Sequence, residues 1–332
     1  MNKRERVLAV LRGERPDRPP YSFWHHFKPE QFSGCPAIEA HLSHLRKYDL
    51  DFLKIMNDTG LPRPSPDWHI RSTQDLDDIE EWTGEEEPFE RELEVIRGIS
   101  KELKGKLLTT VTLFNAWATL RRLCAPHSDH HGPPSLNGAD ERDKTLTRIL
   151  HDDPERLRSA LIRISKGLSR FAQRAIEAGA DGIFLSVRDD WVDTPENGEG
   201  IYDSLVVPTD LEILSGAKEG TFNVLHVCGR ARHFDRFATY PVHALNWADR
   251  YGGPPISAVI YKLKPAIMGG LDNLNTLPHR SPHECAQEAE DALREAEGRP
   301  IIVTPGCTYD PEAVPEENLR AVISVLHRAA QG

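Results

Sequence analysis

The stretch DPERLRSALIRISKGLSRFAQRAIEAGAD (153–181), followed at once by GIFLSV (182–187), decides the fold of this chain. In the first part, apolar residues recur at spacings of three and four, which predicts an amphipathic helix that ends at Gly179. The second part is a short apolar run of the kind found in buried strands. A helix that leads directly into a buried strand is the repeating unit of a parallel sheet.

Seven further apolar runs of strand type occur along the chain, and helical patterns separate most of them. These runs are 20–24, 52–56, 107–113, 222–228, 242–247, 266–271 and 301–305. Eight alternating repeats favour closure into a barrel over an open sheet. We therefore expect a single α/β domain over residues 1–332, a (β/α)8 TIM barrel with a short N-terminal helical extension at residues 1–18. An open doubly wound sheet is the alternative.

Composition and charge limit the classes of function. The chain has 332 residues, of which 39% are hydrophobic and 28% charged, so it can bury a full core. The net charge of −11 and the absence of a dense Lys/Arg stripe argue against nucleic acid as a partner. No apolar stretch has the length of a membrane span or a signal peptide, so we expect no membrane association and a cytoplasmic protein. The five cysteines are too few and too scattered for a disulfide framework.

Three soft metal ligands stand at the ends of predicted strands. His226 and Cys228 lie in LHVCGR (225–230), and Cys307 lies in TPGC, just before the final helix that begins near Pro315. Residues i and i+2 of a strand point the same way, and the carboxyl ends of barrel strands carry the active site. The trio therefore predicts a Zn2+ site with one open coordination position. Alternatively, Cys228 is a small buried apolar side chain and His226 a hydrogen-bonded core residue.

Several sequence blocks resemble one family. The opening MNKRERVLAVLRGERPDRPP is followed in order by DFLKIMND, TLFNAWATL, GADGIFLS, ALNWADR, IMGGLDN and VTPGCTYDPEAVPEENL. Together they resemble the uroporphyrinogen decarboxylase superfamily over almost the whole chain. The resemblance implies a (β/α)8 barrel and one of two chemistries. Members of this superfamily either decarboxylate a tetrapyrrole or, as zinc enzymes, move a methyl group between a corrinoid and a thiol.

Two departures separate the chain from the decarboxylases. They carry an arginine-rich stretch after the first strand, whereas YSFWHHFKPEQFSG (21–34) has His25, His26 and Lys28 but no arginine. A polycarboxylate would lose its bidentate partners there. The decarboxylases also have a histidine in place of Cys307 and lack a His-x-Cys pair at 226–228, while the methyltransferase branch has both features.

The resemblance therefore implies a zinc-dependent methyltransferase. Its co-substrate would be a corrinoid, methylcobalamin carried by a partner corrinoid protein, and its acceptor a small-molecule thiol. A demethylase running in the opposite direction uses the same parts. Two further functions stay open, a carboxy-lyase acting on a tetrapyrrole and a non-catalytic barrel that binds a corrinoid or thiol. Because the superfamily's decarboxylases are often dimers, the resemblance also implies a homodimer.

Further polar residues are candidates for the same site. Asp58 matches the catalytic aspartate of the decarboxylases, although a helix-cap role would also explain it. Candidate substrate-binding residues are His25, His26, Asn115, Trp117, Asp189, Asp190 and Asp272. Asp189 and Asp190 could also serve as a fourth zinc ligand or orient one, or form an exposed acidic loop. The histidines of CAPHSDHHGPP, His127 to His131, are interpreted as part of an irregular lid rather than a metal cluster.

Overall fold

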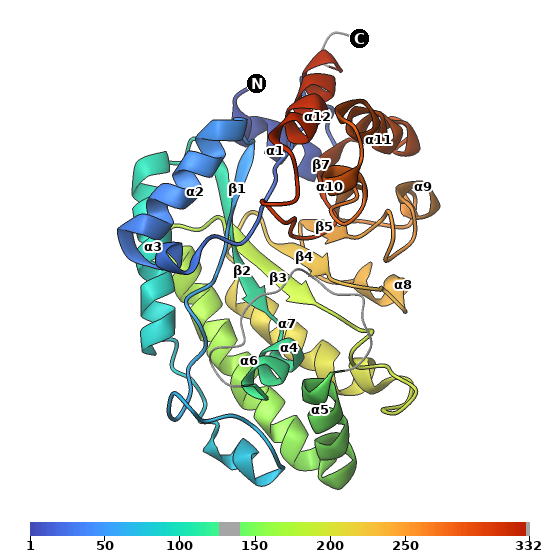
Figure 1. The fold of residues 1–332 in the computed structure, drawn as a ribbon. Helices are drawn as coiled ribbons and strands as arrows, with labels where there is room; N and C mark the ends of the chain where they lie inside the picture. The colour runs from blue at the N-terminus through green and yellow to red at the C-terminus, as the bar shows by residue number, and fades with distance from the viewer. Residues whose placement is uncertain (126–139, 330–332) are drawn as a thin grey trace.

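A seven-stranded parallel sheet forms the centre of the molecule in the computed structural model, which describes residues 1–125 and 140–329 (Figure 1). Its strands neighbour one another in sequence order. They are β1 (Phe52–Ile55), β2 (Leu108–Phe114), β3 (Gly182–Val187), β4 (Val224–Val227), β5 (Ala244–Trp247), β6 (Ala266–Leu271) and β7 (Ile301–Pro305). Sequential parallel order requires crossover connections, which the helices supply.

Most of the helices cover the outside of this sheet. The α-helices are α1 (Lys3–Leu11), α2 (Gly34–Tyr48), α3 (Glu87–Leu103), α4 (Ala116–Leu123), α5 (Glu141–Asp152), α6 (Pro154–Glu177), α7 (Val207–Gly216), α8 (Phe234–Phe237), α9 (Ile256–Val259), α10 (Thr276–His279), α11 (Pro282–Glu295) and α12 (Glu316–Arg328). Two 3-10 helices, η1 (Pro29–Gln31) and η2 (Gln74–Asp78), and a π-helix, η3 (Tyr202–Val206), complete the set. No helix in the described ranges is long and apolar enough to cross a bilayer.

The helix and strand predicted from residues 153–187 are confirmed as α6 and β3. Asp153 caps α6, because its carboxylate accepts a hydrogen bond from Arg156 N at 3.0 Å, and Pro154 fills the first helical position. After the helix, Gly179 adopts φ = +106°, a conformation that favours glycine. The chain then turns directly into β3.

The first of the eight predicted strands is wrong. Residues 20–24 make only an isolated parallel bridge between Tyr21 and Val303 of β7. Pro19 and Pro20 have no N–H to donate, so this segment cannot form a regular ladder. The architecture is therefore a seven-stranded parallel α/β sheet and not the closed eight-stranded barrel that the repeat count predicted.

The short segment 20–22 nevertheless contacts both edge strands. Towards β7, Val303 N donates to Pro20 O at 2.9 Å and Ser22 N donates to Val303 O at 3.3 Å. Towards β1, Ser22 Oγ donates to Phe52 O at 2.9 Å. A few hydrogen bonds from this segment thus link the edge strands β1 and β7, where the sequence predicted a regular strand.

A buried carboxylate fixes this segment. Asp51, which is fully buried, accepts hydrogen bonds from Arg6 Nη1 at 2.7 Å, Arg18 Nη1 at 2.6 Å and Tyr21 N at 3.0 Å. Arg6 belongs to α1, a helix of nine residues within the N-terminal extension predicted at residues 1–18. One carboxylate therefore connects α1, the segment at 20–22 and the start of β1.

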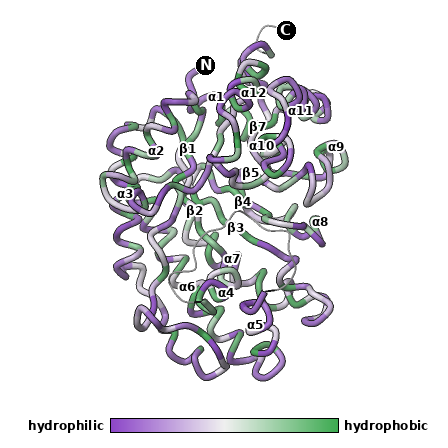
Figure 2. Tube along the Cα trace, in the orientation of Figure 1, coloured by the Kyte–Doolittle hydropathy of each residue, from purple (hydrophilic) through white to green (hydrophobic). Residues whose placement is uncertain are grey.

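Two faces of the sheet have different compositions. The outward face packs on the helices in the larger apolar cluster, and Figure 2 shows hydrophobic residues concentrated along the strands and hydrophilic residues on the surrounding helices. The inward face carries a smaller cluster at the amino-terminal ends of the strands, in which Trp24 lies 5.4 Å from Phe184 and Phe52 lies 5.1 Å from Phe222, between ring centroids. Towards the carboxyl ends the buried inward residues become polar. They are Lys54, Thr110, Thr112, Ser186, His226, Asn246 and Thr304.

We expect the Asp51→Ala variant to lower the free energy of unfolding by about 3–5 kcal/mol, because it leaves Arg6 and Arg18 buried without their shared counter-charge. Urea denaturation followed by circular dichroism measures this loss. The matched control is Glu14→Ala, which breaks the exposed ion pair between Arg12 and Glu14 and should leave the midpoint unchanged. Equal effects of the two variants would contradict the role given to Asp51.

Candidate metal centre

The structure brings the predicted trio of His226, Cys228 and Cys307 together at the carboxyl ends of the strands. Cys307 Sγ lies 3.4 Å from His226 Nε2 and 3.8 Å from Cys228 Sγ, and the three ligand atoms all lie within 4.8 Å of one another. His226 and Cys307 are buried, and Cys228 is half-buried. Residues from β4 and from the loop after β7 thus converge on one point.

Local backbone geometry explains why these side chains meet. His226 and Cys228 are two residues apart along β4 and its extension, so both point to the inward face. On the other side, Gly306 N donates to Leu271 O at 2.9 Å, which holds the loop after β7 against β6. A Cβ on Gly306 would lie 2.7 Å from Ala248 Cα, so this close approach requires glycine.

Asn246 of β5 orients the imidazole. Its Oδ1 lies 2.6 Å from His226 Nδ1, and its Nδ2 donates to Met268 O at 3.1 Å and Pro305 O at 3.2 Å. Since the two carbonyls must face the amide nitrogen, the amide oxygen faces His226. The hydrogen-bond pattern therefore places the proton on Nδ1 and leaves the lone pair of Nε2 directed at the cysteines.

The two thiols influence each other's ionisation. A hydrogen bond from the Cys307 thiol lowers the pKa of Cys228 well below its usual value, and the nearby charge of Arg188 lowers it further. Donating that hydrogen bond and being buried raise the pKa of Cys307 well above its usual value. The pair thus favours one thiolate and one thiol, and a cation would be needed to hold both as thiolates.

The donor set suits zinc. One imidazole nitrogen and two cysteine sulfurs match the ligands of tetrahedral zinc sites, and three protein ligands leave one position for a substrate. In the part of the chain that the structure describes, no fourth histidine, cysteine or carboxylate joins this group. Three protein donors are the number found in catalytic zinc sites, whereas structural sites have four.

A second group of ligand-type residues fits a metal less well. Asp193, Glu199 and His233 lie close enough to share an ion. The Asp193 carboxylate, however, accepts hydrogen bonds from Arg236 Nη2 at 2.7 Å and Tyr202 N at 2.9 Å. Because an arginine already neutralises it, we interpret this group as a structural ion pair.

Asp189 and Asp190 hold the loop that follows Cys228. Asp189 accepts from the backbone N–H groups of Arg232 at 3.1 Å and His233 at 2.9 Å. Asp190 accepts from Arg230 N at 3.1 Å and from Arg188 Nε at 2.6 Å. Both carboxylates thus fix the backbone of the loop next to Cys228.

Asp58 and His26 form a pair at the same end of the sheet. His26 Nδ1 lies 2.9 Å from Asp58 Oδ1, and the Asp58 side chain is buried. His25 instead donates through Nδ1 to His26 O at 2.7 Å and packs on Tyr309, with ring centroids 5.3 Å apart. Tyr309 lies two residues beyond Cys307, so the histidine segment contacts the loop that carries the third ligand.

The remaining predicted residues shape the surrounding turns. Asn115 caps α4 by accepting from Ala118 N at 2.9 Å, and Trp117 in α4 is buried. Within residues 1–125 and 140–329, the indole N–H of Trp117 finds no hydrogen-bond partner. Asp272 accepts from Leu274 N at 2.8 Å and so closes the turn before α10. The histidines at 127–131 lie outside the described residues.

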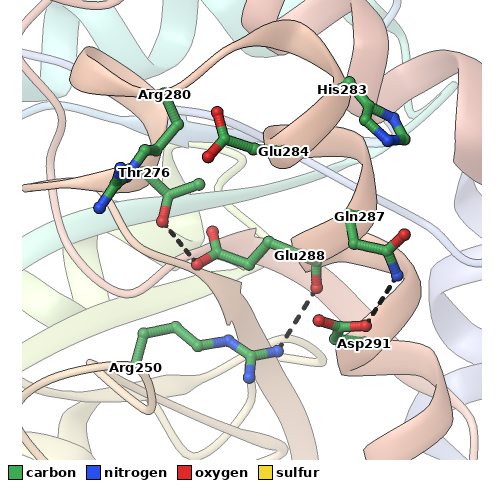
Figure 3. Close-up of a pocket in the computed structure, with 8 residues that line it drawn as sticks. All are labelled: Arg250, Thr276, Arg280, His283, Glu284, Gln287, Glu288 and Asp291. Carbon is green, nitrogen blue, oxygen red and sulfur yellow. Dashed lines mark hydrogen bonds between the residues drawn. The ribbon is translucent and has the colours of Figure 1, made fainter.

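A pocket of about 460 Å³ lies beside this turn, away from the trio (Figure 3). Its lining residues are Arg250, Thr276, Arg280, His283, Glu284, Gln287, Glu288 and Asp291. Glu288 accepts from Thr276 Oγ1 at 2.8 Å and from Asp272 N at 2.9 Å, and burial raises its pKa to about 7. Its carboxyl therefore supports the turn at Asp272, and none of the predicted site residues lines this pocket.

Two residues next to the trio were not predicted. Asn246 and Lys54 both lie on the inward face, one in ALNWADR and the other in DFLKIMND. The available signal was a single polar residue inside an apolar run, in register with inward-facing neighbours. A polar residue of this kind is expected to face inward, but the sequence does not show which side chains it contacts.

Comparison with known proteins identifies the family of this α/β protein. The chain belongs to the uroporphyrinogen decarboxylase (URO-D) family, whose model matches residues 53–329. A solved methyltransferase from Methanosarcina mazei is 17% identical with a TM-score of 0.73, and the match covers 99% of each chain. A protein from Listeria monocytogenes described as a putative vitamin-B12-independent methionine synthase is 12% identical with a TM-score of 0.53, over 89% of this chain and 85% of that one. These likenesses establish the fold. No curated protein sequence matches the chain.

We expect Asn246→Ala to weaken zinc binding about 10- to 100-fold, because the imidazole loses the group that fixes its tautomer and direction. Competition with a chromophoric chelator measures the affinity. The control is Asn318→Ala, which removes another buried asparagine, whose Nδ2 donates to Leu277 O at 2.7 Å and Arg280 O at 2.9 Å rather than to the strands beside the trio. Similar losses in the two variants would show that general destabilisation, and not orientation of His226, is responsible.

The buried carboxyl of Asp210 predicts how the stability of the protein depends on pH. Asp210 accepts from Tyr202 Oη at 2.7 Å and Tyr240 Oη at 2.8 Å, and burial raises its pKa from 3.8 to about 7. The folded protein therefore holds this proton more tightly, so the contribution of Asp210 to stability is largest below about pH 4 and falls as the pH rises to about 7. The fall is roughly 1.4 kcal/mol for each pH unit between the two pKa values.

Asp210→Asn should remove this component of the pH dependence. The test compares urea midpoints of the two proteins at about pH 5 and pH 8. Exposed Asp152→Asn serves as the control and should retain the dependence of the unmodified protein. A profile that Asp210→Asn leaves unchanged would contradict the assignment.

Proposed function

We propose that this protein is a zinc-dependent methyltransferase that moves a methyl group between a corrinoid and a thiol. The observation that carries the proposal is the convergence of His226 Nε2, Cys228 Sγ and Cys307 Sγ within 4.8 Å at the carboxyl end of the sheet. Three such ligands hold a zinc ion and leave one position for a sulfur substrate. When bound, zinc supplies a Lewis acid that lowers the pKa of a coordinated thiol and makes a thiolate available at neutral pH.

The protein's own residues would position the reacting sulfur. Asn246 holds His226 in one tautomer, and Asp189 and Asp190 hold the backbone beside Cys228. The Asp58 carboxylate, paired with His26, offers a hydrogen-bond acceptor for a polar group of the substrate. In this proposal Asn115, Trp117 and Asp272 act indirectly, through the turns that they stabilise.

The relatives support methyl transfer and leave its donor to experiment. The Methanosarcina mazei neighbour is a methyltransferase, and its fold matches this chain over its full length. The Listeria monocytogenes neighbour is described as independent of vitamin B12. A corrinoid donor, carried by a partner protein, is therefore a proposal that rests on the sequence resemblance and on the ligand set.

Decarboxylation of a tetrapyrrole is the second candidate, because the chain belongs to the uroporphyrinogen decarboxylase family. Recognition of several carboxylates needs the planar forks of arginine side chains. The segment 21–34 after the first predicted strand contains no arginine. We therefore favour methyl transfer.

Metal analysis tests the centre itself. The purified protein should contain about one zinc per chain, and Cys307→Ser should lose most of it because the site keeps only two ligands. The control is Cys285→Ser, which changes a buried cysteine whose Sγ donates to Thr276 O at 3.4 Å and which is not a member of the trio. A protein that is fully active without metal would end the zinc proposal.

Turnover tests the reaction. With methylcobalamin and a panel of small thiols, the absorbance of methylcobalamin should decrease only when the zinc-loaded protein is present, and Cys307→Ser should abolish the change. Incubation with uroporphyrinogen should release no carbon dioxide. Decarboxylation without demethylation would favour the second candidate, and neither reaction would favour a binding protein.

A further inference from the structure

A lysine is buried inside the sheet, close to the trio. Lys54 of β1 is 5% exposed, and its inward direction follows from its position between Phe52 and Met56 in the inner cluster. Its Nζ donates to Met56 Sδ at 3.0 Å and lies 4.6 Å from the ring centroid of Phe184 and 5.6 Å from that of Trp24. A thioether and two aromatic faces therefore form its immediate surroundings.

This ammonium group has no carboxylate at ion-pair distance in the described part of the chain. Burial of a charge is costly without a partner, and it lowers the pKa of Lys54 to about 8. The group still carries its proton at neutral pH. The titratable groups that face it are Cys307, Asp58 and Cys228.

The lysine lies one ring away from the proposed metal ligands. The Phe184 ring of β3 contacts both groups, because its centroid lies 4.6 Å from Lys54 Nζ and 5.2 Å from the centroid of the His226 imidazole. On the neighbouring strand, Thr110 pairs with Lys54, and its buried hydroxyl has no hydrogen-bond partner among the residues that the structure describes. A fixed positive charge thus lies just inside the centre, in a region that water screens weakly.

Charge balance suggests what this lysine is for. A zinc ion with two thiolates and a neutral imidazole has no net charge, so with a neutral fourth ligand the centre adds nothing to the attraction between Lys54 and Asp58. A thiolate as the fourth ligand gives the centre one negative charge. Only in this second state does the centre itself attract the Lys54 charge.

We propose that Lys54 is a positioning residue that makes the proposed zinc centre prefer an anionic fourth ligand, so that the acceptor is bound as a thiolate. The inference rests on the proposed function, since it requires the zinc centre. On binding, the S–H bond of the acceptor breaks, the electron pair stays on sulfur, and the proton passes to the solvent. Neutral ligands such as thioethers or amines gain nothing from Lys54.

The test uses cobalt(II) in place of zinc, because cobalt reports its ligands through visible absorption. The full-length cobalt protein is titrated with 2-mercaptoethanol, which binds as an anion, and with imidazole, which binds as a neutral ligand. Lys54→Met should weaken 2-mercaptoethanol binding about tenfold at pH 7 and raise the pH midpoint of that binding by about one unit. Imidazole binding should change less than twofold, and metal content should not change.

Matched variants distinguish the effect of the Lys54 charge from a general loss of stability. Lys54→Gln is a second neutral replacement and should behave like Lys54→Met, whereas Lys262→Met removes an exposed lysine and should have no effect. Equal weakening of both ligands, or an unchanged pH midpoint for 2-mercaptoethanol, would overturn the inference while leaving the zinc proposal intact. Failure of the unmodified protein to bind any metal would overturn both.

Discussion

The side chain of Asn246 links four consecutive strands at the carboxyl end of the sheet. It lies on β5, accepts from His226 on β4, and donates to the main chain of Met268 on β6 and Pro305 on β7. A buried amide is costly unless its donors and acceptor are satisfied, so this residue constrains the spacing of all four strands. The direction of the imidazole and the approach of Cys307 both follow from that spacing. The geometry of the trio is therefore set largely by the sheet.

A second constraint operates at the opposite end of the sheet. Asp51 connects α1 to the segment at residues 20–22, and this segment in turn contacts β1 and β7. The two ends of the sheet are thus held by different chemistry. Charge pairing with arginine fixes the edges, and an uncharged hydrogen-bond network fixes the site. Between the two ends of the sheet, the inward-facing side chains change from aromatic to polar. The charged Lys54 lies towards the polar end, where the trio is.

Much of the fold could be predicted from the alternation of helical and strand patterns. Seven of the eight expected apolar runs form strands, because β-branched and aromatic residues buried on both faces favour a central parallel sheet. The run at 20–24 failed because its pattern is apolar but its prolines lack donors. The trio could be predicted because a strand period of two and the common edge of parallel strands bring its members together.

Other features of the site depend on packing that no local pattern records. Asn246 and Lys54 each occupy one polar position in an apolar run, and only the register between strands shows which neighbours they meet. The partners of Asp189 and Asp190 also depend on packing. The sequence predicted only that these two carboxylates lie near the trio. Their hydrogen bonds to the backbone after Cys228 depend on the path of a loop, which sequence spacing does not define.

The aromatic cluster at the amino-terminal end of the sheet has a kinetic consequence. Trp24, Phe52 and Phe184 are all at most 2% exposed, so the interior is sealed on that side. In the proposed reaction, molecules that reach His226 and Cys307 would therefore not enter from that end. Two substrates would share the opposite end, and the release of one product would delay the entry of the next reactant. Product inhibition patterns would report this shared entrance directly.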